Sequence, residues 1–309
     1  GSGKTRGNRS PNAVFLMVKN QDKSLGYAAL SVLIWSTVAT AFKLALRERD
    51  PVQLIFIASG VSALFLLFWL LVTGQFRQLS QTTGRELLRS MAVGLLNPFG
   101  YYLILFKAYS LLPAQLAQPL NMIWPVTLAF LSIPLLKQKI TWRQFLALGV
   151  CLLGIVLLSS QGSISGFRNT SLTGVILALG SSLLWALFWI FNIKDQRPEA
   201  VKLFLNFFFG FLYLLMIMPL FSEFRFPAGI SLWAALYTGL FEVGITYLLW
   251  MKAMQLSDNN AVTGSLIYAA PFLSLLLISS VLGEKIHPTT IAGLVLIVSG
   301  IVYQQIKRR

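Results

Sequence analysis

The stretch PVQLIFIASGVSALFLLFWLLV, residues 51–72, contains no charged side chain. A helix needs about 20 apolar residues to cross a hydrocarbon core about 30 Å thick. Further stretches of similar length and apolar character lie at 25–46, 87–107, 114–136, 141–159, 172–192, 201–221, 231–252, 261–282 and 289–306. The sequence therefore predicts an all-α integral membrane protein with ten transmembrane helices.

The composition supports a membrane protein over a soluble one. Hydrophobic residues make up 56% of the chain and charged residues 11%, where a soluble domain carries about 25% charged residues. The net charge of +15 could indicate a nucleic-acid partner, but most basic residues lie in short segments between the apolar stretches. We therefore expect membrane lipids as partners and no nucleic acid.

The distribution of the 25 basic residues predicts the orientation of the chain. With a cytoplasmic N-terminus, 18 of them fall on the inner side and 6 on the outer side, and Lys43 lies within the first span. Because basic residues concentrate on the cytoplasmic side, both termini are expected there. The expected location is the cell membrane, specifically the bacterial inner membrane, as a multi-pass protein.

The chain repeats itself about 145 residues apart. Phe106-Lys107-Ala108 recurs as Met251-Lys252-Ala253, and at an offset of 146 Pro125 corresponds to Pro271 and Gly154 to Gly300. We predict a first five-helix repeat at 25–159, a connecting loop at 160–171 and a second five-helix repeat at 172–306. Residues 1–24 are expected to be a disordered basic tail with a tag remnant, Gly1-Ser2, and residues 307–309 a basic C-terminal end.

An odd number of spans in each repeat would place the two repeats upside down relative to each other. Inverted repeats are the architecture of many secondary transporters, in which two gates surround a site near the middle of the membrane. The alternative is that duplication only builds a larger helix bundle.

Glu242 is the only carboxylate deep within a predicted span, and Asn97 is its counterpart in the first repeat. Ionisable groups inside a membrane are costly, so they invite a functional interpretation. Glu242 could contact a substrate amine or act as a protonatable switch. Alternatively, it is a neutral carboxyl that is hydrogen bonded to a neighbouring helix.

The fourth span combines polar side chains with prolines. Gln118, Asn121 and Pro125 fall on one face of a helix, and Pro119 also interrupts its backbone hydrogen bonds. The ninth span has Tyr268 and Pro271 at a comparable place. We predict a broken helix in a cavity wall, with hydrogen bonding between helices as the alternative.

Aromatic residues inside the spans could stack on a flat or cationic ligand, or they could simply pack in the core. Those chosen as cavity candidates are Trp35, Tyr101, Trp124 and Trp185. A second group lies nearer the span ends and is expected at the membrane interfaces: Trp69, Trp142, Trp233 and Trp250. Glycines are expected where helices approach closely, at positions 174, 180, 210, 239, 244 and 264.

Few groups in the sequence could support catalysis. The chain has one histidine, His287, and one cysteine, Cys151, and no nucleotide motif or metal-ligand spacing. We therefore expect no enzyme activity, no catalytic residues, no metal and no cofactor.

Several motifs resemble one family. They are Leu33-Ile34-Trp35-Ser36 with Lys43, Phe106-Lys107-Ala108 with Pro125 and Gly154, and Gly283-Glu284-Lys285-Ile286. Together they resemble EamA-type members of the drug/metabolite transporter superfamily. Asn121-Met122-Ile123-Trp124-Pro125 is most similar to the bacterial aromatic amino-acid exporter branch. The resemblance implies a ten-helix exporter fold with a central cavity and efflux of amino acids or related metabolites.

These observations lead to one main hypothesis, a secondary transporter that exports small metabolites such as amino acids by alternating access. The alternative is a lipid-handling or scaffold membrane protein without a solute path. A small-molecule substrate is the expected partner, and a homodimer is left open. The candidate substrate-binding residues are Trp35, Asn97, Tyr101, Gln118, Asn121, Trp124, Trp185, Glu242 and Tyr268.

Overall fold

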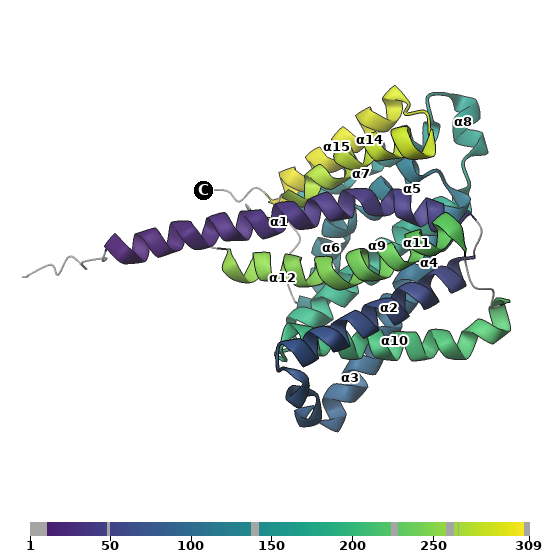
Figure 1. Ribbon diagram of the computed structural model, residues 1–309. Coiled ribbons are helices and arrows are strands. Elements are labelled where there is room, and N and C mark those ends of the chain that lie inside the picture. Colours follow the sequence, from purple (N-terminus) through teal and green to yellow (C-terminus); the bar gives the residue numbers. More distant parts are fainter. Residues whose placement is uncertain are drawn as a thin grey trace, which may run out of the picture.

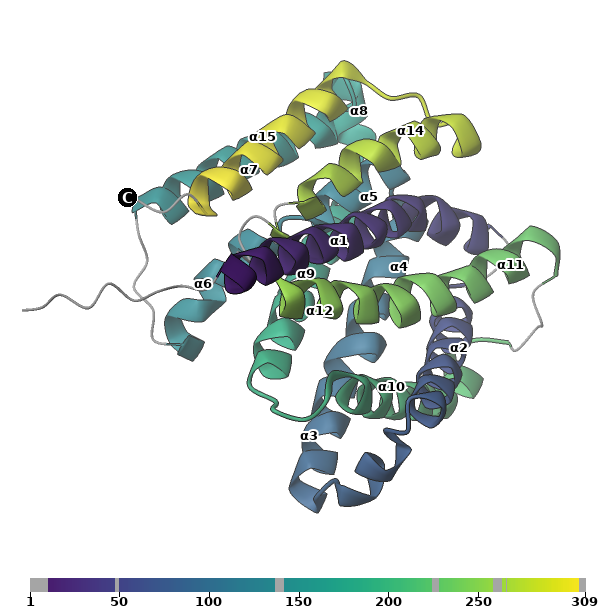
Figure 2. The same cartoon turned by 60° about the vertical axis from the view of Figure 1, so that its left-hand side comes forward.

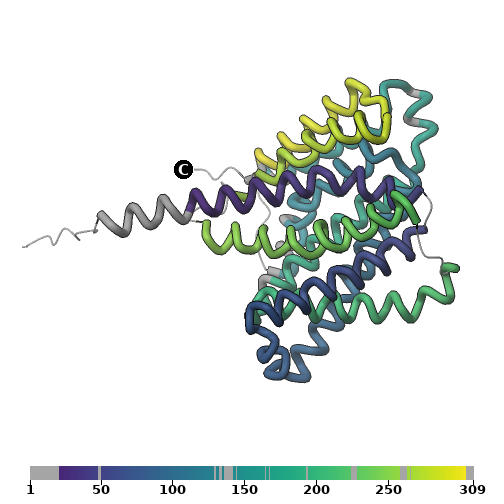
Figure 3. The backbone as a smooth tube through the Cα atoms, viewed as in Figure 1, coloured from purple at the N-terminus to yellow at the C-terminus, as the bar shows by residue number. Residues whose placement is uncertain are grey.

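The computed structural model describes residues 11–47, 50–136, 142–223, 228–257, 263–264 and 266–305 (Figure 1, Figure 3). Every regular element in these ranges is helical. Six helical segments are long and apolar enough to cross a membrane: Gln21–Ala45, Pro51–Val72, Gly84–Leu111, Leu172–Asn192, Glu199–Phe221 and Gly229–Leu256. Shorter apolar helices cover Phe145–Ser160, Leu266–Leu282 and Pro288–Tyr303. The all-helical class predicted from the sequence is confirmed for the described residues.

The elements follow the same order in the two halves. The first half holds α1 (Pro11–Ala45), α2 (Pro51–Val72), η1 (Phe76–Gln81), α3 (Gly84–Gly94), η2 (Leu95–Gly100), α4 (Tyr101–Leu111), α5 (Ala114–Asn121), α6 (Trp124–Leu136) and α7 (Trp142–Ser160). After α8 (Ile164–Asn169), the second half holds α9 (Leu172–Ile193), α10 (Glu199–Phe221), α11 (Gly229–Tyr237), η3 (Thr238–Ile245), α12 (Thr246–Leu256), η4 (Leu266–Ala269), α14 (Ala270–Leu282) and α15 (Pro288–Gln305). The π-helical turns η2 and η3 interrupt corresponding long helices.

Helix α1 begins earlier than the sequence suggested. It starts at Pro11, so the part of the expected tail from residue 11 to residue 24 is helical. Ser24 is buried, and its Oγ donates to the Ala253 carbonyl at 2.8 Å and lies 3.0 Å from Thr263 Oγ1. This packing against the second half, together with the bond from Gln21 Nε2 to Thr263 Oγ1 at 3.3 Å, holds the helix from residue 21 onward. The predicted tail at residues 1–10 and the C-terminal residues 307–309 lie outside the described residues.

Local signals fix several helix ends. Asp50 caps α2 by accepting from the amides of Val52 and Gln53, at 2.8 and 3.0 Å. Thr83 and Glu86 form a capping box at the start of α3. Gly283 ends α14 in the left-handed conformation, with φ of 70°, which glycine adopts without steric cost. These caps set where the chain turns back at the ends of the bundle.

The two halves pack against each other in matching pairs (Figure 2). Helix α1 packs on α12 and α14, and helix α9, its counterpart, packs on α4, α5 and α6. Likewise α2 packs on η3, and α10 packs on α3 and η2. The remaining pairs, α2 with α10 and α7 with α15, join equivalent helices. The observed packing thus has the pairwise correspondence that the sequence repeat suggests.

The first helices of the two halves run in opposite directions. Near the end of α1, Lys43 Nζ donates to the carbonyls of Tyr109 and Leu112 at the end of α4, at 2.8 and 2.9 Å. At the start of α3, Arg89 donates to the carbonyl of Phe191 near the end of α9, at 2.7 Å. Helix α1 is therefore parallel to α4, whereas α9 is antiparallel to α3 and α4.

Glycines allow the closest contacts between the halves. A Cβ on Gly94 would lie 2.5 Å from the Asn206 carbonyl of α10, and one on its repeat counterpart Gly239 would lie 2.6 Å from the Ala58 carbonyl of α2. Gly154 of α7 and Gly293 of α15 face each other's carbonyl oxygens in the same way, at 2.7 and 2.6 Å from the added Cβ. Side chains at these positions would force the helices apart.

The glycines predicted at close contacts divide into two groups. Four of them have a neighbouring helix within 3 Å of an added Cβ: Gly174, Gly210, Gly239 and Gly244. An added Cβ on Gly180 or Gly264 would meet no neighbouring helix within 4 Å among the described residues, so the predicted close contact is not found there. Periodicity cannot tell which face of a helix a glycine occupies relative to a neighbour.

Candidate functional site

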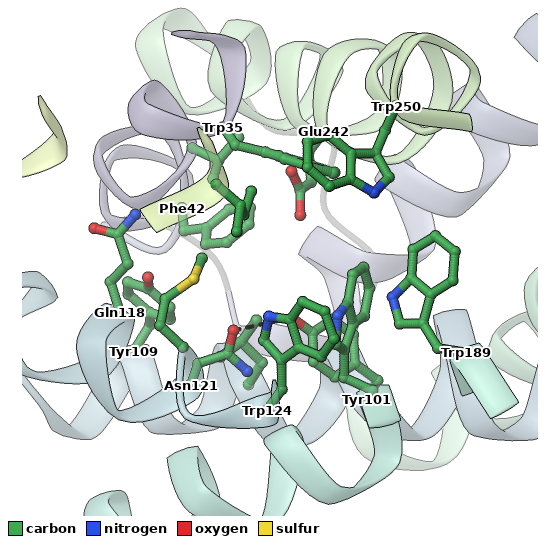
Figure 4. Close-up of a pocket in the computed structure, with 15 residues that line it drawn as sticks. Trp35, Phe42, Tyr101, Tyr109, Gln118, Asn121, Trp124, Trp189, Glu242 and Trp250 are labelled. Carbon is green, nitrogen blue, oxygen red and sulfur yellow. Dashed lines mark hydrogen bonds between the residues drawn. The ribbon is translucent and has the colours of Figure 1, made fainter. Parts of the chain in front are cut away.

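A narrow cavity that is partly open to solvent lies between the two halves (Figure 4). Helices α1, α4, α5, α6, α9 and α12 contribute to its walls, together with the irregular turns η3 and η4. Its lining is mainly aromatic: Trp35, Phe42, Tyr101, Tyr109, Trp124, Trp185, Trp189 and Trp250, with Val38, Leu105, Met122 and Ile267. Three further lining residues are polar: Gln118, Asn121 and Glu242.

Glu242 enters the cavity from the π-helical turn η3 and is 5% exposed. Its Oε1 accepts a hydrogen bond from the Tyr102 hydroxyl at 3.0 Å. No described donor has hydrogen-bonding geometry toward Oε2, although the indole of Trp35 is a close polar neighbour. One carboxylate oxygen is therefore hydrogen bonded to Tyr102, while the other lies close to the Trp35 indole without a hydrogen bond of good geometry.

Behind Glu242, hydroxyl and amide groups form a second layer. The Tyr102 hydroxyl lies 3.5 Å from the Tyr247 hydroxyl, which accepts from Asn97 Nδ2 at 3.2 Å. Asn97 is fully buried and does not line the cavity. This layer orients Tyr102, and through it the Glu242 carboxyl, from the side away from the cavity.

The amide groups on the opposite wall come from the broken fourth helix. Helix α5 ends at Asn121 and α6 begins at Trp124, which confirms the interruption predicted at the prolines. The Asn121 side chain accepts from the Tyr101 hydroxyl at 3.2 Å and donates to Ser181 Oγ at 2.8 Å. Gln118 is 3% exposed, yet neither of its amide atoms has a hydrogen-bond partner among the described residues.

Aromatic pairs make the cavity walls rigid. The rings of Trp35 and Trp250 lie 5.3 Å apart with 56° between their planes, on helices from different halves. Tyr101 and Trp185 lie 4.8 Å apart, again across the halves. Such pairs keep large ring faces in place around a narrow space. A flat, partly apolar molecule would match these walls.

Comparisons with known proteins identify the fold. The model of the EamA-like transporter family matches residues 23–160 and again residues 172–303. The chain belongs to the EamA-like transporter family.

Relatives of this EamA-family chain agree with that assignment. It is 24% identical to an uncharacterized transporter of Archaeoglobus fulgidus, over 88% of this chain and 94% of the relative. It is 26% identical to the aromatic amino acid exporter YddG of Ancylobacter novellus, over 85% of this chain and 89% of that one. A crystal structure with 20% sequence identity has a similar fold, with a TM-score of 0.65 over 92% of this chain and 96% of the other.

Family membership also answers the broader questions raised by the sequence. The EamA-family matches and the transporter relatives show a membrane transporter and not an enzyme. Several long apolar helices fit a multi-pass protein of the bacterial cell membrane. Groups of three or more histidine, cysteine, aspartate or glutamate side chains that could hold a metal do not occur among the described residues.

Most of the substrate-binding residues predicted from the sequence lie together in the structure. The cavity is lined by Trp35, Tyr101, Gln118, Asn121, Trp124, Trp185 and Glu242. Asn97 lies behind the wall, and Ile267 lines the cavity in place of its neighbour Tyr268. Other lining residues were not among the predicted site residues: Val38, Phe42, Leu105, Tyr109, Met122, Trp189 and Trp250.

Trp250 corrects one expectation directly. Its position near a span end suggested an interfacial residue, but it is 8% exposed and its ring packs at a tilted angle against Trp35 in the cavity wall. The other three tryptophans of that group, Trp69, Trp142 and Trp233, are exposed on the surface of the bundle. Trp250 lies on the face of α12 that packs against α1, whereas distance from a span end does not distinguish the faces of a helix.

A second space adjoins the central cavity. Trp189 and Trp250 line both spaces and stand between them. At its far end Lys202 pairs with Glu199 at 2.7 Å and donates to the carbonyls of Asn192 and Asp195.

Proposed function

We propose that this EamA-family protein is a secondary transporter that exports small metabolites, such as amino acids, by alternating access. Ten membrane-spanning helices would form two five-helix halves of opposite orientation, with both termini in the cytoplasm. A small-molecule substrate would bind between the halves, and membrane lipids would surround them. The named relative that exports aromatic amino acids supports the substrate class.

The opposite directions of α1 and α9 support the inverted arrangement. If α1 crosses toward the outer side, then α4 does so too, because Lys43 joins the ends of both helices. Helix α9 is antiparallel to α4, so it would cross inward. Two halves that enter the membrane in opposite senses provide similar gates on its two sides.

One observation carries the proposal: residues from both halves line a single cavity. Trp35 and Asn121 belong to the first half, and Trp185 and Glu242 to the second. Any relative movement of the halves would change the cavity and its access at the same time. A scaffold protein would have no need of unpaired polar groups such as those of Gln118 at such an interface.

Transport can be tested with purified protein in liposomes. Efflux or uptake of radiolabelled amino acids and of the amine tryptamine would be measured against liposomes without protein and against liposomes with Trp124→Ala. We expect saturable flux of at least one aromatic amino acid or a related amine, with flux strongly reduced in the variant. Saturable flux of none of the compounds would remove the transport proposal.

Cysteine accessibility separates a transporter from a scaffold. In a Cys151→Ala background, Met122→Cys places a thiol in the cavity wall, and Asn97→Cys places one in the buried layer behind it. A water-soluble maleimide should label the first and not the second, and a transported compound should slow the labelling. Equal resistance at both positions would favour a protein without a solute path.

A further inference from the structure

We propose that the cavity selects ligands with one net positive charge, borne by an amine next to an aromatic or apolar body. A ligand carboxylate would not be required and would weaken binding, so within the proposed class of small metabolites the cavity would favour amines and amino-acid amides over zwitterionic amino acids. The inference rests on the proposed transport function, because it names the substrate class of the same cavity. It goes further by assigning the charge that the ligand must carry.

The charge of the lining is the first argument. Among the described residues around the cavity, Glu242 is the carboxyl group, and no lysine, arginine or histidine is present. Its Oε2 lies close to the Trp35 indole but accepts no hydrogen bond of good geometry from a described residue, so an ammonium group could donate to it. In a site of low dielectric constant, such a charged hydrogen bond is stronger than one between neutral groups.

The lysines that approach the bundle do not supply a positive counterpart. Lys43 donates to the carbonyls of Tyr109 and Leu112 outside the cavity. Lys202 is paired with Glu199 and donates to two further carbonyls in the adjoining space. Both ammonium groups are therefore already satisfied, and neither lines the cavity.

The tryptophans provide the second argument. In Figure 4 the Glu242 carboxyl projects between Trp35 and Trp250, while Trp124 and Trp189 face the same space. Tryptophan rings have a negative electrostatic face and are the strongest cation–π partners among the aromatic side chains. A cation bound to Glu242 would therefore also meet favourable ring faces, which an anion would not.

A zwitterionic amino acid would fit less well. Its carboxylate would have to be stabilised by neutral amides, of which Asn121 already bonds to Tyr101 and Ser181. Gln118 retains a free amide, but one neutral donor does not offset the cost of burying a carboxylate. An amide or hydrogen in place of the ligand carboxylate removes this cost.

Four indole compounds of similar size test the inference by calorimetric titration of the purified protein. Tryptamine and tryptophanamide carry one positive charge, tryptophan is a zwitterion, and indole-3-propionate is an anion. We expect the two cations to bind, tryptophan to bind weaker by a factor of about ten or more, and the anion not to bind. Equal affinity for tryptophan and tryptamine, or no binding of either cation, would overturn the inference.

Glu242→Gln keeps an oxygen that can accept from Tyr102 but removes the charge. We expect tryptamine affinity to fall by a factor of about 30 or more, as for loss of one member of a buried ion pair. Unchanged tryptamine binding in the folded variant would contradict the assignment. Binding that depends on Glu242 without any flux would support the inference and reject transport. Flux that is independent of Glu242 would support transport and reject the inference.

A second variant keeps the test valid if Glu242→Gln does not fold. Trp250→Phe retains an aromatic ring with a weaker electrostatic face, and Trp233→Phe is the matched control on the exposed surface. We expect Trp250→Phe to weaken tryptamine binding roughly threefold or more while binding of neutral 3-methylindole changes little. Equal losses for both compounds would indicate packing alone and overturn the role of ligand charge.

Discussion

Glu284 accepts a hydrogen bond from the backbone amide of Ala114, with 2.9 Å between Oε1 and the nitrogen. The second oxygen accepts from the Gln115 amide at 3.2 Å. Glu284 lies in the turn between α14 and α15, so one half of the chain caps the first turn of α5 in the other. An anionic group at a helix N-terminus is stabilised both by these bonds and by the helix dipole.

Replacing Glu284 by alanine should therefore destabilise the contact between the halves. Loss of two hydrogen bonds to a charged acceptor should lower the free energy of unfolding by about 1–3 kcal/mol. Denaturation in mixed micelles would measure this change, and Glu284→Gln should show an intermediate effect. Asp22→Asn, at an exposed position, serves as the control. If Glu284→Ala and the control behaved alike, the cap would have no energetic role.

Glycine-to-alanine substitutions should act in opposite directions at two positions. At Gly94 the new Cβ would lie 2.5 Å from the Asn206 carbonyl, so we expect a loss of about 1–3 kcal/mol from overpacking. At Gly180 no other atom lies within 4 Å, and alanine should stabilise helix α9 by about 0.5–1 kcal/mol. Unfolding midpoints measured in the same detergent compare the two, and a gain at Gly94 would refute the close contact.

Gln118→Leu should separate binding from folding. The wild-type amide is buried without partners, which costs about 1–3 kcal/mol, so an apolar residue of similar size should leave stability unchanged or higher. If Gln118 contacts the ligand, affinity should fall at the same time. Thermal unfolding without ligand and titration with tryptamine give the two readings. A variant that is less stable yet binds normally would assign Gln118 a structural role.

The ionised Asp195 side chain should make the stability of the folded protein depend on pH in the acidic range. Burial opposes the effect, but hydrogen bonds from Arg197 and the charge of Arg89 hold the pKa of Asp195 below its ordinary value. The contribution is therefore complete above the unfolded-state pKa of about 3.9 and is lost as pH falls through the folded-state pKa. Midpoints recorded from about pH 5 downward should decline less in Asp195→Asn than in the parent. Parallel curves would exclude this ion pair as the cause.

Much of the architecture could be predicted because lipid imposes simple rules on sequence. Apolar stretches mark the helices, and repeated residues mark equivalent positions, so that Gly94 and Gly239 make the same kind of contact 145 residues apart. The prolines next to Asn121 also predicted the break between α5 and α6. These features depend on local sequence, which is why they needed no tertiary information.

The orientation of individual side chains could not be predicted in the same way. Asn97 and Glu242 are repeat counterparts, yet Asn97 has an extended backbone, with φ of −151° and ψ of 122°, and lies behind the wall. Trp250 was misplaced because distance from a span end gives depth but not the direction in which a side chain points. The first error follows from a local break in the helical backbone, and the second from rotation about a helix axis, which is determined by packing between the halves.

The contact between α7 and α15 limits where anything can cross this molecule. With Gly154 and Gly293 each against the other's carbonyl oxygen, backbone meets backbone and no lipid tail or water file fits between them. The contact between α7 and α15 is therefore closed to solutes. In a rearrangement that preserves this contact, the rest of each half would rotate about it. A solute path would instead have to use the cavity to which α1, α9 and α12 contribute wall residues.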